Sequence, residues 1–109
     1  MAAPKAYWIA RVTVTDPDAY AGYQALAPQA FAKYGAKFLA RGGRALTCEG
    51  PEWQRHVVIE FESLDAARDC YDSPEYRAAR QKRAGACHAE ICAKQVAYLE
   101  VHQQFPSND

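Results

Sequence analysis

The chain has 109 residues, half of them hydrophobic, and its 13 basic and 13 acidic side chains give a formal net charge of zero. This length suits one globular domain, and the balanced charge offers no basic face that would favour nucleic acid as a partner. No apolar run approaches the ~20 residues of a membrane span, and the N-terminus lacks the apolar segment of a signal peptide, so we predict a cytoplasmic protein with neither membrane nor nucleic acid as a partner.

The first predicted element is a strand over residues 5–14. Trp8 and Val12 fall on one face of it and Tyr7 on the other, and both faces are largely apolar. A strand with two apolar faces is typical of the centre of a sheet that is covered on both sides. Arg11 then either buries its stem while its charged head reaches the edge, or belongs to a polar site.

A long helix is predicted next, over residues 16–34. Asp16 and Pro17 are typical of a helix start. Pro28 lies inside the helix and is expected to kink or split it, because proline removes a hydrogen bond and clashes with the preceding turn. Tyrosines such as Tyr23 recur at helical spacing. They suit either core packing, with hydroxyls at the rim, or a ligand site.

Two strands are predicted at residues 36–40 and 56–61, joined as a hairpin. The second is the most apolar and β-branched run of the chain, which favours a buried strand. Gly42 and Gly43 together allow a bend or bulge after the first strand, and a short strand is expected to resume over residues 45–48. Glu60 lies in the middle of the apolar run and indicates a second, functional surface.

A broken helix is predicted after the third strand. Ser63 and Ser73 are both typical N-cap residues, and Pro74 suits the first position of the second helix. This second helix is expected to end near Arg83. Residues 84–94 then fit either a continuation of the helix or a loop.

The chain is predicted to end in a strand and a tail. Residues 95–101 alternate as a strand does, with Val96 and Tyr98 on one face. Residues 103–109 are polar and contain a proline, so we expect a flexible tail. Residues 1–102 are predicted to form a single domain.

The four cysteines contain no C-x-x-C pair. They are Cys48, Cys70, Cys87 and Cys92. We expect reduced thiols rather than a disulfide framework. Cys87, His88 and Cys92 are of the types that zinc prefers, but a structural zinc site needs four well-spaced ligands. We therefore predict no metal site and no cofactor.

The predicted order β-α-β-β-α-β is the ferredoxin-like pattern of the α+β class. Right-handed crossovers put both helical segments on one side of the sheet. The uncovered face is then predicted to carry Tyr7, Ile9, Arg11, Leu39, Arg41, Val58, Glu60, Val96 and Tyr98. This face is too apolar to remain in water. We therefore predict a homodimer in which two sheets face each other and enclose a barrel-like interior.

Several short motifs together resemble one bacterial family. They are Tyr7-Trp8-Ile9-Ala10, Asp16-Pro17 with Tyr20, Tyr34-Gly35, Arg41-Gly42-Gly43, Val58-Ile59-Glu60-Phe61 and Ser73-Pro74-Glu75-Tyr76. Over residues 5–83 the combination resembles the family called domain of unknown function 1330, within the dimeric α/β-barrel superfamily. The resemblance implies a ferredoxin-like protomer and a dimer, but no reaction. Residues 85–94 depart from it, since they look longer and richer in cysteine than the family's usual approach to its last strand.

The superfamily includes cofactorless oxygenases of phenolic substrates, isomerases, haem-handling enzymes and ligand-sensing modules, and a shared fold alone does not select among them. The chain contains no G-x-S-x-G, Gly-rich phosphate loop or H-E-x-x-H motif. We predict that a small anionic, phenolic or enolic molecule is bound or transformed in the barrel or in the cleft between sheet and helices. The alternative is a non-catalytic ligand-sensing or structural dimerisation module.

Four polar side chains are predicted to converge on the side of the sheet away from the helices: Arg11, Arg41, His56 and Glu60. In a functional site an arginine would orient the anion while Glu60 or His56 moves a proton. In a structural role Glu60 would neutralise Arg41 or Arg11 as a buried pair. Hydroxyl groups or stacking surface could come from three tyrosines, for which core packing is the alternative: Tyr7, Tyr23 and Tyr76.

Overall fold

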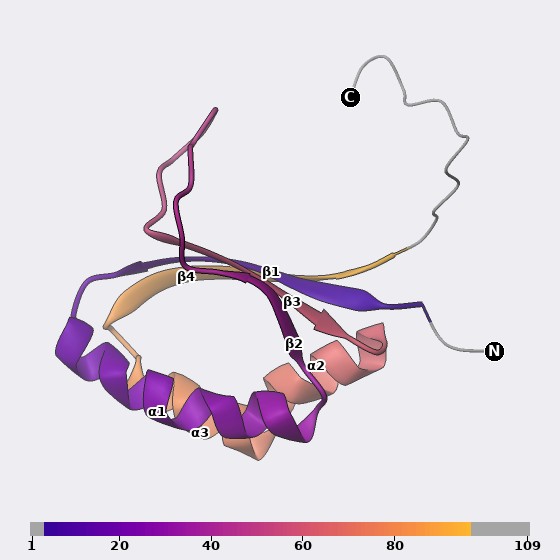
Figure 1. The fold of residues 1–109 in the computed structure, drawn as a ribbon. Coiled ribbons are helices and arrows are strands. Elements are labelled where there is room, and N and C mark those ends of the chain that lie inside the picture. Colours follow the sequence, from indigo (N-terminus) through magenta and orange to yellow (C-terminus); the bar gives the residue numbers. More distant parts are fainter. Residues whose placement is uncertain (1–3, 97–109) are drawn as a thin grey trace, which may run out of the picture.

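The computed structural model describes residues 4–96, which form one antiparallel sheet with three helices on one side (Figure 1). The strands are β1 (Ala6–Val14), β2 (Lys37–Arg41), β3 (Arg55–Phe61) and β4 (Cys87–Gln95). The helices are α1 (Pro17–Lys33), α2 (Leu64–Asp72) and α3 (Pro74–Lys82). The strand order is β2-β3-β1-β4. These elements confirm the predicted ferredoxin-like α+β architecture.

The core lies between the helices and the sheet, and it is centred on Trp8 of β1. This side chain is 1% exposed, and its ring contacts Phe31 of α1, Phe61 of β3 and Tyr76 of α3 at centroid distances of 5.5, 5.2 and 5.2 Å. Its indole Nε1 donates a hydrogen bond to the carbonyl of Ala67 at 3.1 Å. One residue thus joins β1 to its sheet neighbour and to all three helices.

The helix starts that the sequence predicts are confirmed, but of the kink or split expected at Pro28 the split is wrong. The Asp16 side chain accepts from the backbone N–H of Ala19, and α1 then runs without interruption through Pro28. Proline removes only one hydrogen bond from the helix. The buried side chains of Ala27 and Phe31, on either side of Pro28, anchor the same stretch in the core.

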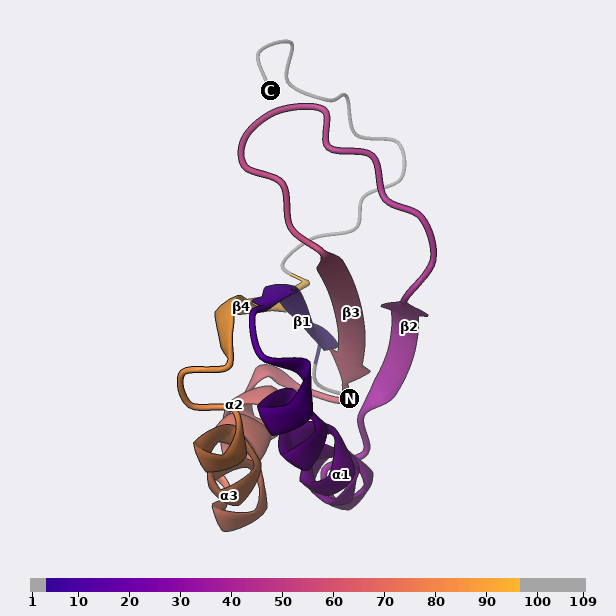
Figure 2. The ribbon, with the colours of Figure 1, turned by 90° about the vertical axis from the view of Figure 1, so that its left-hand side faces the viewer.

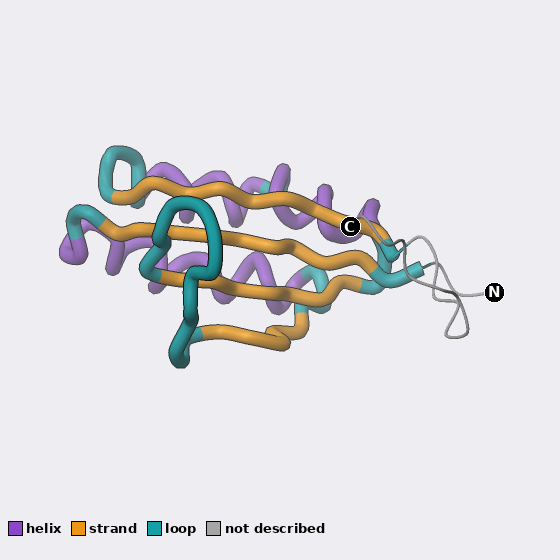
Figure 3. The backbone as a smooth tube through the Cα atoms, turned by 90° about the horizontal axis from the view of Figure 1, so that it is seen from above, coloured by secondary structure: helices purple, strands orange, loops and turns teal. Residues whose placement is uncertain are grey.

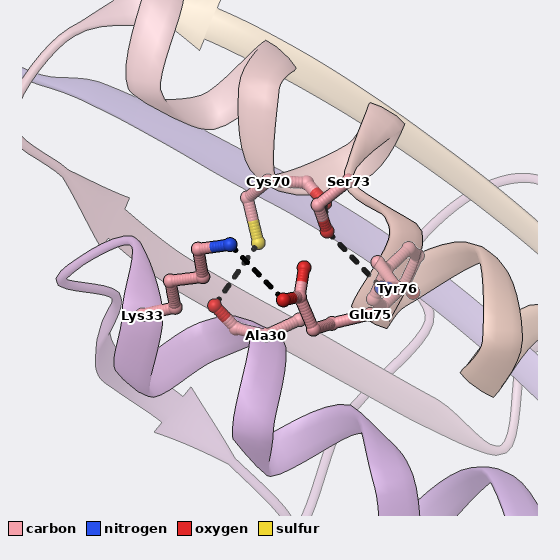
Figure 4. A network of polar contacts seen from close by, with 6 residues as sticks. All are labelled: Ala30, Lys33, Cys70, Ser73, Glu75 and Tyr76. Carbon is pink, nitrogen blue, oxygen red and sulfur yellow. Dashed lines mark hydrogen bonds and ion pairs between the residues drawn. The ribbon is translucent and has the colours of Figure 1, made fainter.

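The junction of α2 and α3 is built around Ser73 (Figure 4). Its hydroxyl donates to the carbonyl of Cys70 at 2.7 Å and accepts from the backbone N–H of Tyr76 at 3.1 Å, so it ends one helix and caps the next. Lys33 at the end of α1 forms a 3.0 Å ion pair with Glu75. This ion pair, together with the thiol of Cys70 donating to the α1 backbone, fastens α1 to the other helices.

Residues 42–54 form a long loop between β2 and β3 that stands out on the side of the sheet away from the helices (Figures 1 and 2). The short strand predicted at 45–48 is absent from this described loop. Gly42 and Gly43 both have positive φ, 74° and 80°, and this conformation takes the chain out of the sheet. The loop returns at Gln54, whose side chain accepts from the backbone N–H of Val14 at 2.9 Å.

The last strand lies earlier than predicted. β4 occupies Cys87–Gln95, where a helix or loop was expected, and pairs with β1 along its whole length. The chain turns at Gly85, with φ of 76°, and the carbonyl of Ala86 accepts from two backbone N–H groups after β1. This local anchoring starts β4 directly after α3. Residues 97–101 of the predicted strand, including Tyr98, and the predicted tail at 103–109 lie outside the described residues.

The second side of the sheet carries no helix from residues 4–96, and we call it the open face (Figure 3). Tyr7 lies opposite Glu60 and Ile9 opposite Val58 on this face. Ile9 is 46% and Leu39 50% exposed. No helix in the described part of the chain is long and apolar enough to cross a membrane.

Arg41 was predicted on the open face, and this placement is wrong. The pairing of β2 with β3 shifts register between Phe38 and Ala40, which is a β-bulge. Before the bulge Phe38 pairs with Ile59, and after it Arg41 pairs with Val57, so Arg41 lies on the helix side. An extra residue in one strand reverses the side to which all later residues point.

Candidate functional site

A cavity of about 400 Å³ lies between the sheet and the helices. This volume is within the range of small-molecule sites in proteins. Its lining combines aromatic rings, apolar side chains and arginines from all four strands, from α1 and α3, and from the ends of these elements. The lining includes Trp8, Ala10, Tyr20, Tyr23, Ala27, Arg41, Arg55, Val57, Ile59, Tyr76 and Arg83.

The strand register arranges the sheet side of the cavity in layers. The innermost layer holds Trp8 opposite Ile59. In the next layer Ala10 lies opposite Val57, and Val57 also pairs with Arg41. Because the side chain of Ala10 is smaller than its neighbours, it leaves space between the sheet and the helices at this layer. The chemistry of the wall therefore changes from aromatic to basic along the strands.

The basic end of the cavity is formed by three arginines from different parts of the chain. Arg55 begins β3 and lies opposite Val12, Arg41 ends β2, and Arg83 is the C-cap of α3. Each guanidinium lies over an aromatic ring: Arg41 over Phe38 at 4.4 Å, Arg55 over Tyr20 at 5.2 Å, and Arg83 over Tyr23 at 4.8 Å.

No acidic side chain is among the described residues that line the cavity, and none of its three arginines forms an ion pair within residues 4–96. Of the three, Arg83 has the least satisfied hydrogen-bond donors. Its Nε is buried without a hydrogen-bond partner in that part of the chain, and its NH1 donates only to the Sγ of Cys87, a weak acceptor, at 3.5 Å. Burial alone would lower the pKa of Arg83, but Tyr76 and Cys87 raise it, so the group stays charged. The cavity therefore keeps a positive charge that the surrounding protein does not neutralise.

Three tyrosine hydroxyls lie beside these cations. The hydroxyl oxygens of Tyr23 and Tyr76 are 2.7 Å apart and share a hydrogen bond. Burial raises the pKa of both, and it also raises the pKa of Tyr20 despite the nearby charges of Arg55 and Arg83. All three hydroxyls are therefore neutral near pH 7 and can donate hydrogen bonds.

The structure divides the predicted site between the two sides of the sheet. Arg41, Tyr23 and Tyr76 line the cavity on the helix side. The others lie on the open face: Tyr7, Arg11, His56 and Glu60. The predicted convergence of Arg11, Arg41, His56 and Glu60 on one side is therefore wrong for Arg41.

On the open face Glu60 does not form the buried pair with Arg11 that was predicted as its structural role, and each of the two has another partner. Glu60 lies 3.9 Å from the Nζ of Lys5 and accepts from the Tyr7 hydroxyl at 3.4 Å. Arg11 forms a 3.0 Å ion pair with Glu90 of β4. His56 lies opposite Arg11 and keeps a buried Nδ1 that has no hydrogen-bond partner in the described chain. This face therefore combines apolar side chains with charges of both signs, several of which form ion pairs within the chain.

Sequence reasoning missed Arg55 and Arg83. Arg55 continues the period-2 alternation of Val57 and Ile59, so that pattern could have placed it on the helix side. Arg83 looks like part of a solvated basic helix surface, and only the turn at Gly85 directs the chain after it back into the sheet. Nothing local in the sequence distinguishes it from Arg80.

The residues considered for zinc do not come together. Along β4, Cys87 lies opposite Val14 on the helix side, while His88 and Cys92 lie on the open face. Within residues 4–96 no group of three or more His, Cys, Asp or Glu side chains could hold a metal ion. The expectation that the protein takes no metal and no cofactor stays a prediction.

Comparison with protein families supports the resemblance seen in the sequence. The family model described as Domain of unknown function (DUF1330) matches residues 5–95. The chain belongs to the DUF1330 family. The match continues through β4, so residues 85–94 belong to the family's common region rather than departing from it. A comparison with curated proteins found no match.

Solved structures share this DUF1330 fold at low sequence identity. A protein of unknown function from Rhodopseudomonas palustris has a TM-score of 0.72 and 20% identity, with 88% of this chain and 85% of that chain covered. A dimeric protein of unknown function with a ferredoxin-like fold from Bacteroides fragilis has a TM-score of 0.58 and 15% identity, covering 88% and 100%. SnoaB, a cofactor-independent oxygenase from Streptomyces nogalater, has a TM-score of 0.56 and 17% identity, covering 93% and 100%. At these identities the likeness establishes the fold alone.

Proposed function

We propose that this DUF1330 protein binds a small anionic molecule, with a phenolic, enolic or related planar ring, in the cavity between the sheet and the helices. One observation carries the proposal: the wall joins aromatic rings to three arginines and, among the described residues, includes no acid. Aromatic rings bind a planar apolar body. Guanidinium groups favour planar oxyanions, and an anion would neutralise the charge that the protein leaves unbalanced.

The same wall favours binding over proton-transfer catalysis. A general base that works near neutral pH is usually His, Asp or Glu, and none of these lines the described cavity. The tyrosines that do line it are held neutral by burial. We therefore propose a binding or ligand-sensing role and expect His56 and Glu60, on the other side of the sheet, to take no part in it.

We propose further that a second copy of the chain covers the open face. The B. fragilis protein of the same fold is dimeric, and the open face of this chain exposes Ile9 and Leu39. Apolar surface of this kind is typically covered by a partner. The cavity lies on the opposite side of the sheet, so dimerisation and ligand binding would not compete.

Calorimetric titration tests the binding proposal, with 2-naphthoate and 2-naphthol as probes of the anionic and the phenolic type. Ala27→Leu places a larger side chain in the cavity wall, and Ala25→Leu makes the same change at an exposed position of α1. We expect at least one probe to bind the wild type and Ala25→Leu, and to bind Ala27→Leu about tenfold more weakly because part of its space is filled. Circular dichroism checks that both variants fold. The proposal fails if neither probe binds, or if Ala27→Leu binds as the wild type does.

A further inference from the structure

We infer that the ligand is an aryl monocarboxylate, whose carboxylate binds between Arg55 and Arg83 while its ring lies against Trp8. This inference rests on the proposed function and deepens it, because it specifies the anionic group and the direction in which the molecule enters. Three features carry it: the two guanidinium groups that flank the neighbouring rings of Tyr20 and Tyr23, the unsatisfied Nε of Arg83, and the apolar inner surface of Trp8 and Ile59.

The two guanidinium groups approach the same end of the cavity from different elements. Arg55 comes from the sheet and lies 5.2 Å from the Tyr20 ring, while Arg83 comes from the end of α3 and lies 4.8 Å from the Tyr23 ring. These two rings are neighbours, with centroids 5.1 Å apart. The arginines therefore flank one aromatic pair, with the Tyr20 hydroxyl as an additional donor. A carboxylate has two oxygens and can accept from donors on both sides.

Arg83 provides the donor that most needs a ligand. Its Nε is buried and has no partner within residues 4–96. A buried donor without an acceptor costs free energy, more so when it is charged. The thiol of Cys87 partly satisfies NH1, but sulfur is a weak acceptor. A carboxylate oxygen would give this side chain a charge-assisted hydrogen bond.

The inner part of the cavity favours an apolar ring over a second polar group on the ligand. Tyr23 and Tyr76 already share one hydrogen bond, with their hydroxyl oxygens 2.7 Å apart, so only one hydroxyl proton of the pair is left for a ligand. Around them lie two apolar residues, Trp8 and Ile59, which are 1% and 2% exposed respectively. This asymmetry selects a molecule with one charged end and one apolar end, as in an aromatic acid with a single carboxylate.

The test compares three probes that share one ring system: 2-naphthoate, the neutral 2-naphthamide and 2-naphthol. Each is titrated calorimetrically into wild-type protein and into Arg83→Met, Arg55→Met and Arg77→Met. Methionine keeps an apolar stem but removes the charge. Arg77 is the matched control because it is exposed on α3 and does not line the cavity. Arg83→Lys keeps the charge without the planar fork and serves if Arg83→Met does not fold.

We expect 2-naphthoate to bind the wild type at least about tenfold more tightly than 2-naphthamide, since a charge-assisted hydrogen bond contributes more than a neutral one. Arg83→Met and Arg55→Met should each weaken naphthoate binding by about tenfold, while Arg77→Met leaves it unchanged. Naphthoate binding should also weaken as salt is raised. For 2-naphthol we expect neither the loss of affinity in Arg83→Met and Arg55→Met nor the weakening with salt.

Three results overturn the inference in distinguishable ways. If 2-naphthol binds as tightly as 2-naphthoate and is weakened by Ala27→Leu, the cavity is a site for phenolic ligands but not a carboxylate site. In that case the proposed function stands and the inference fails. The inference also fails if Arg55→Met and Arg83→Met both bind naphthoate as the wild type does. If none of the three probes binds, both the inference and the proposed function fail.

Discussion

The two faces of the sheet place neighbouring residues of one strand in opposite environments. Trp8 and Ile9 are adjacent in β1, yet Trp8 is 1% exposed under the helices and Ile9 is 46% exposed on the open face. On the helix face the apolar residues form a buried core around a cavity. On the open face the apolar residues have no such cover within the described chain. The helix face can therefore supply a ligand site within one protomer, whereas the open face is the side on which we propose a second copy.

Charge separates the two faces in the same way. On the open face Lys5 pairs with Glu62 and Glu60, and Arg11 pairs with Glu90. On the helix face the arginines of the cavity have no acidic partner within residues 4–96. A charge that is already paired within the chain costs less to cover with another protein than an unpaired charge does. An uncancelled positive charge in a cavity suits an anionic ligand.

The largest expected effect separates Trp8 from Ile9. Trp8→Ala removes the centre of the core and the hydrogen bond to Ala67, so we expect it to lower the free energy of unfolding by about 3–5 kcal/mol. Ile9→Ala removes a half-exposed side chain and should cost less than Trp8→Ala. Urea denaturation of both variants measures the difference. An equal loss in the free energy of unfolding at the two positions would contradict the distinction between a buried core and an open face.

The next effect concerns assembly. Val58→Asp puts a carboxylate at the centre of the open face, opposite Ile9, and burying it against a second copy would be costly. We expect the dimer dissociation constant to rise by at least about a hundredfold. Ala21→Asp adds the same charge at an exposed position of α1 and is the control. Sedimentation velocity over a dilution series gives both constants. If the wild type is monomeric at micromolar concentration, or if Val58→Asp dimerises like Ala21→Asp, the second copy is not bound through this face.

A smaller effect appears at alkaline pH and concerns only the helix face. Burial raises the pKa of Tyr20, Tyr23 and Tyr76 above the ordinary value of 10.0. The unfolded state therefore ionises first. The stability that these groups contribute is fully present below about pH 10 and is lost as pH rises towards their folded-state pKa values. Urea denaturation at increasing pH should show this decline, and Tyr23→Phe should reduce it. Ionisation of all seven tyrosines near pH 10, with the fold intact by circular dichroism, would contradict the burial of these hydroxyls.

The smallest effect is expected at Glu60. Glu60→Gln changes a carboxylate that contacts Lys5 and Tyr7 on the open face, so affinity for 2-naphthoate should stay within about twofold of the wild type because the cavity lies across the sheet. Calorimetric titration of this variant, beside Arg83→Met, measures the contrast. A loss of ligand binding in Glu60→Gln at unchanged stability would move the site to the open face.

How far the sequence predicts this molecule depends on the range of the interactions involved. Helix caps such as Ser73 depend on residues a few positions away, and they were predicted correctly, as was the alternation of β1 and β3. The side on which Arg41 lies depends on a one-residue bulge between β2 and β3, which alternation alone does not reveal. The start of β4 depends on tertiary anchoring at Ala86. The role of Arg83 depends on which side chains the folded chain brings around it, and local pattern carries no signal for that.

The central claim is that the ligand binds on the helix face of the sheet and not on the open face. The two tryptophans report on these faces separately: Trp8 lines the cavity, and Trp53, in the loop on the open side, lies with its ring 5.8 Å from the Arg11 guanidinium. Fluorine NMR of the protein labelled with 5-fluorotryptophan gives one resonance for each residue, and Trp53→Phe assigns them. We expect titration with 2-naphthoate to shift the Trp8 resonance to saturation and to leave that of Trp53 in place. A shift of Trp53 with an unmoved Trp8 would contradict the account.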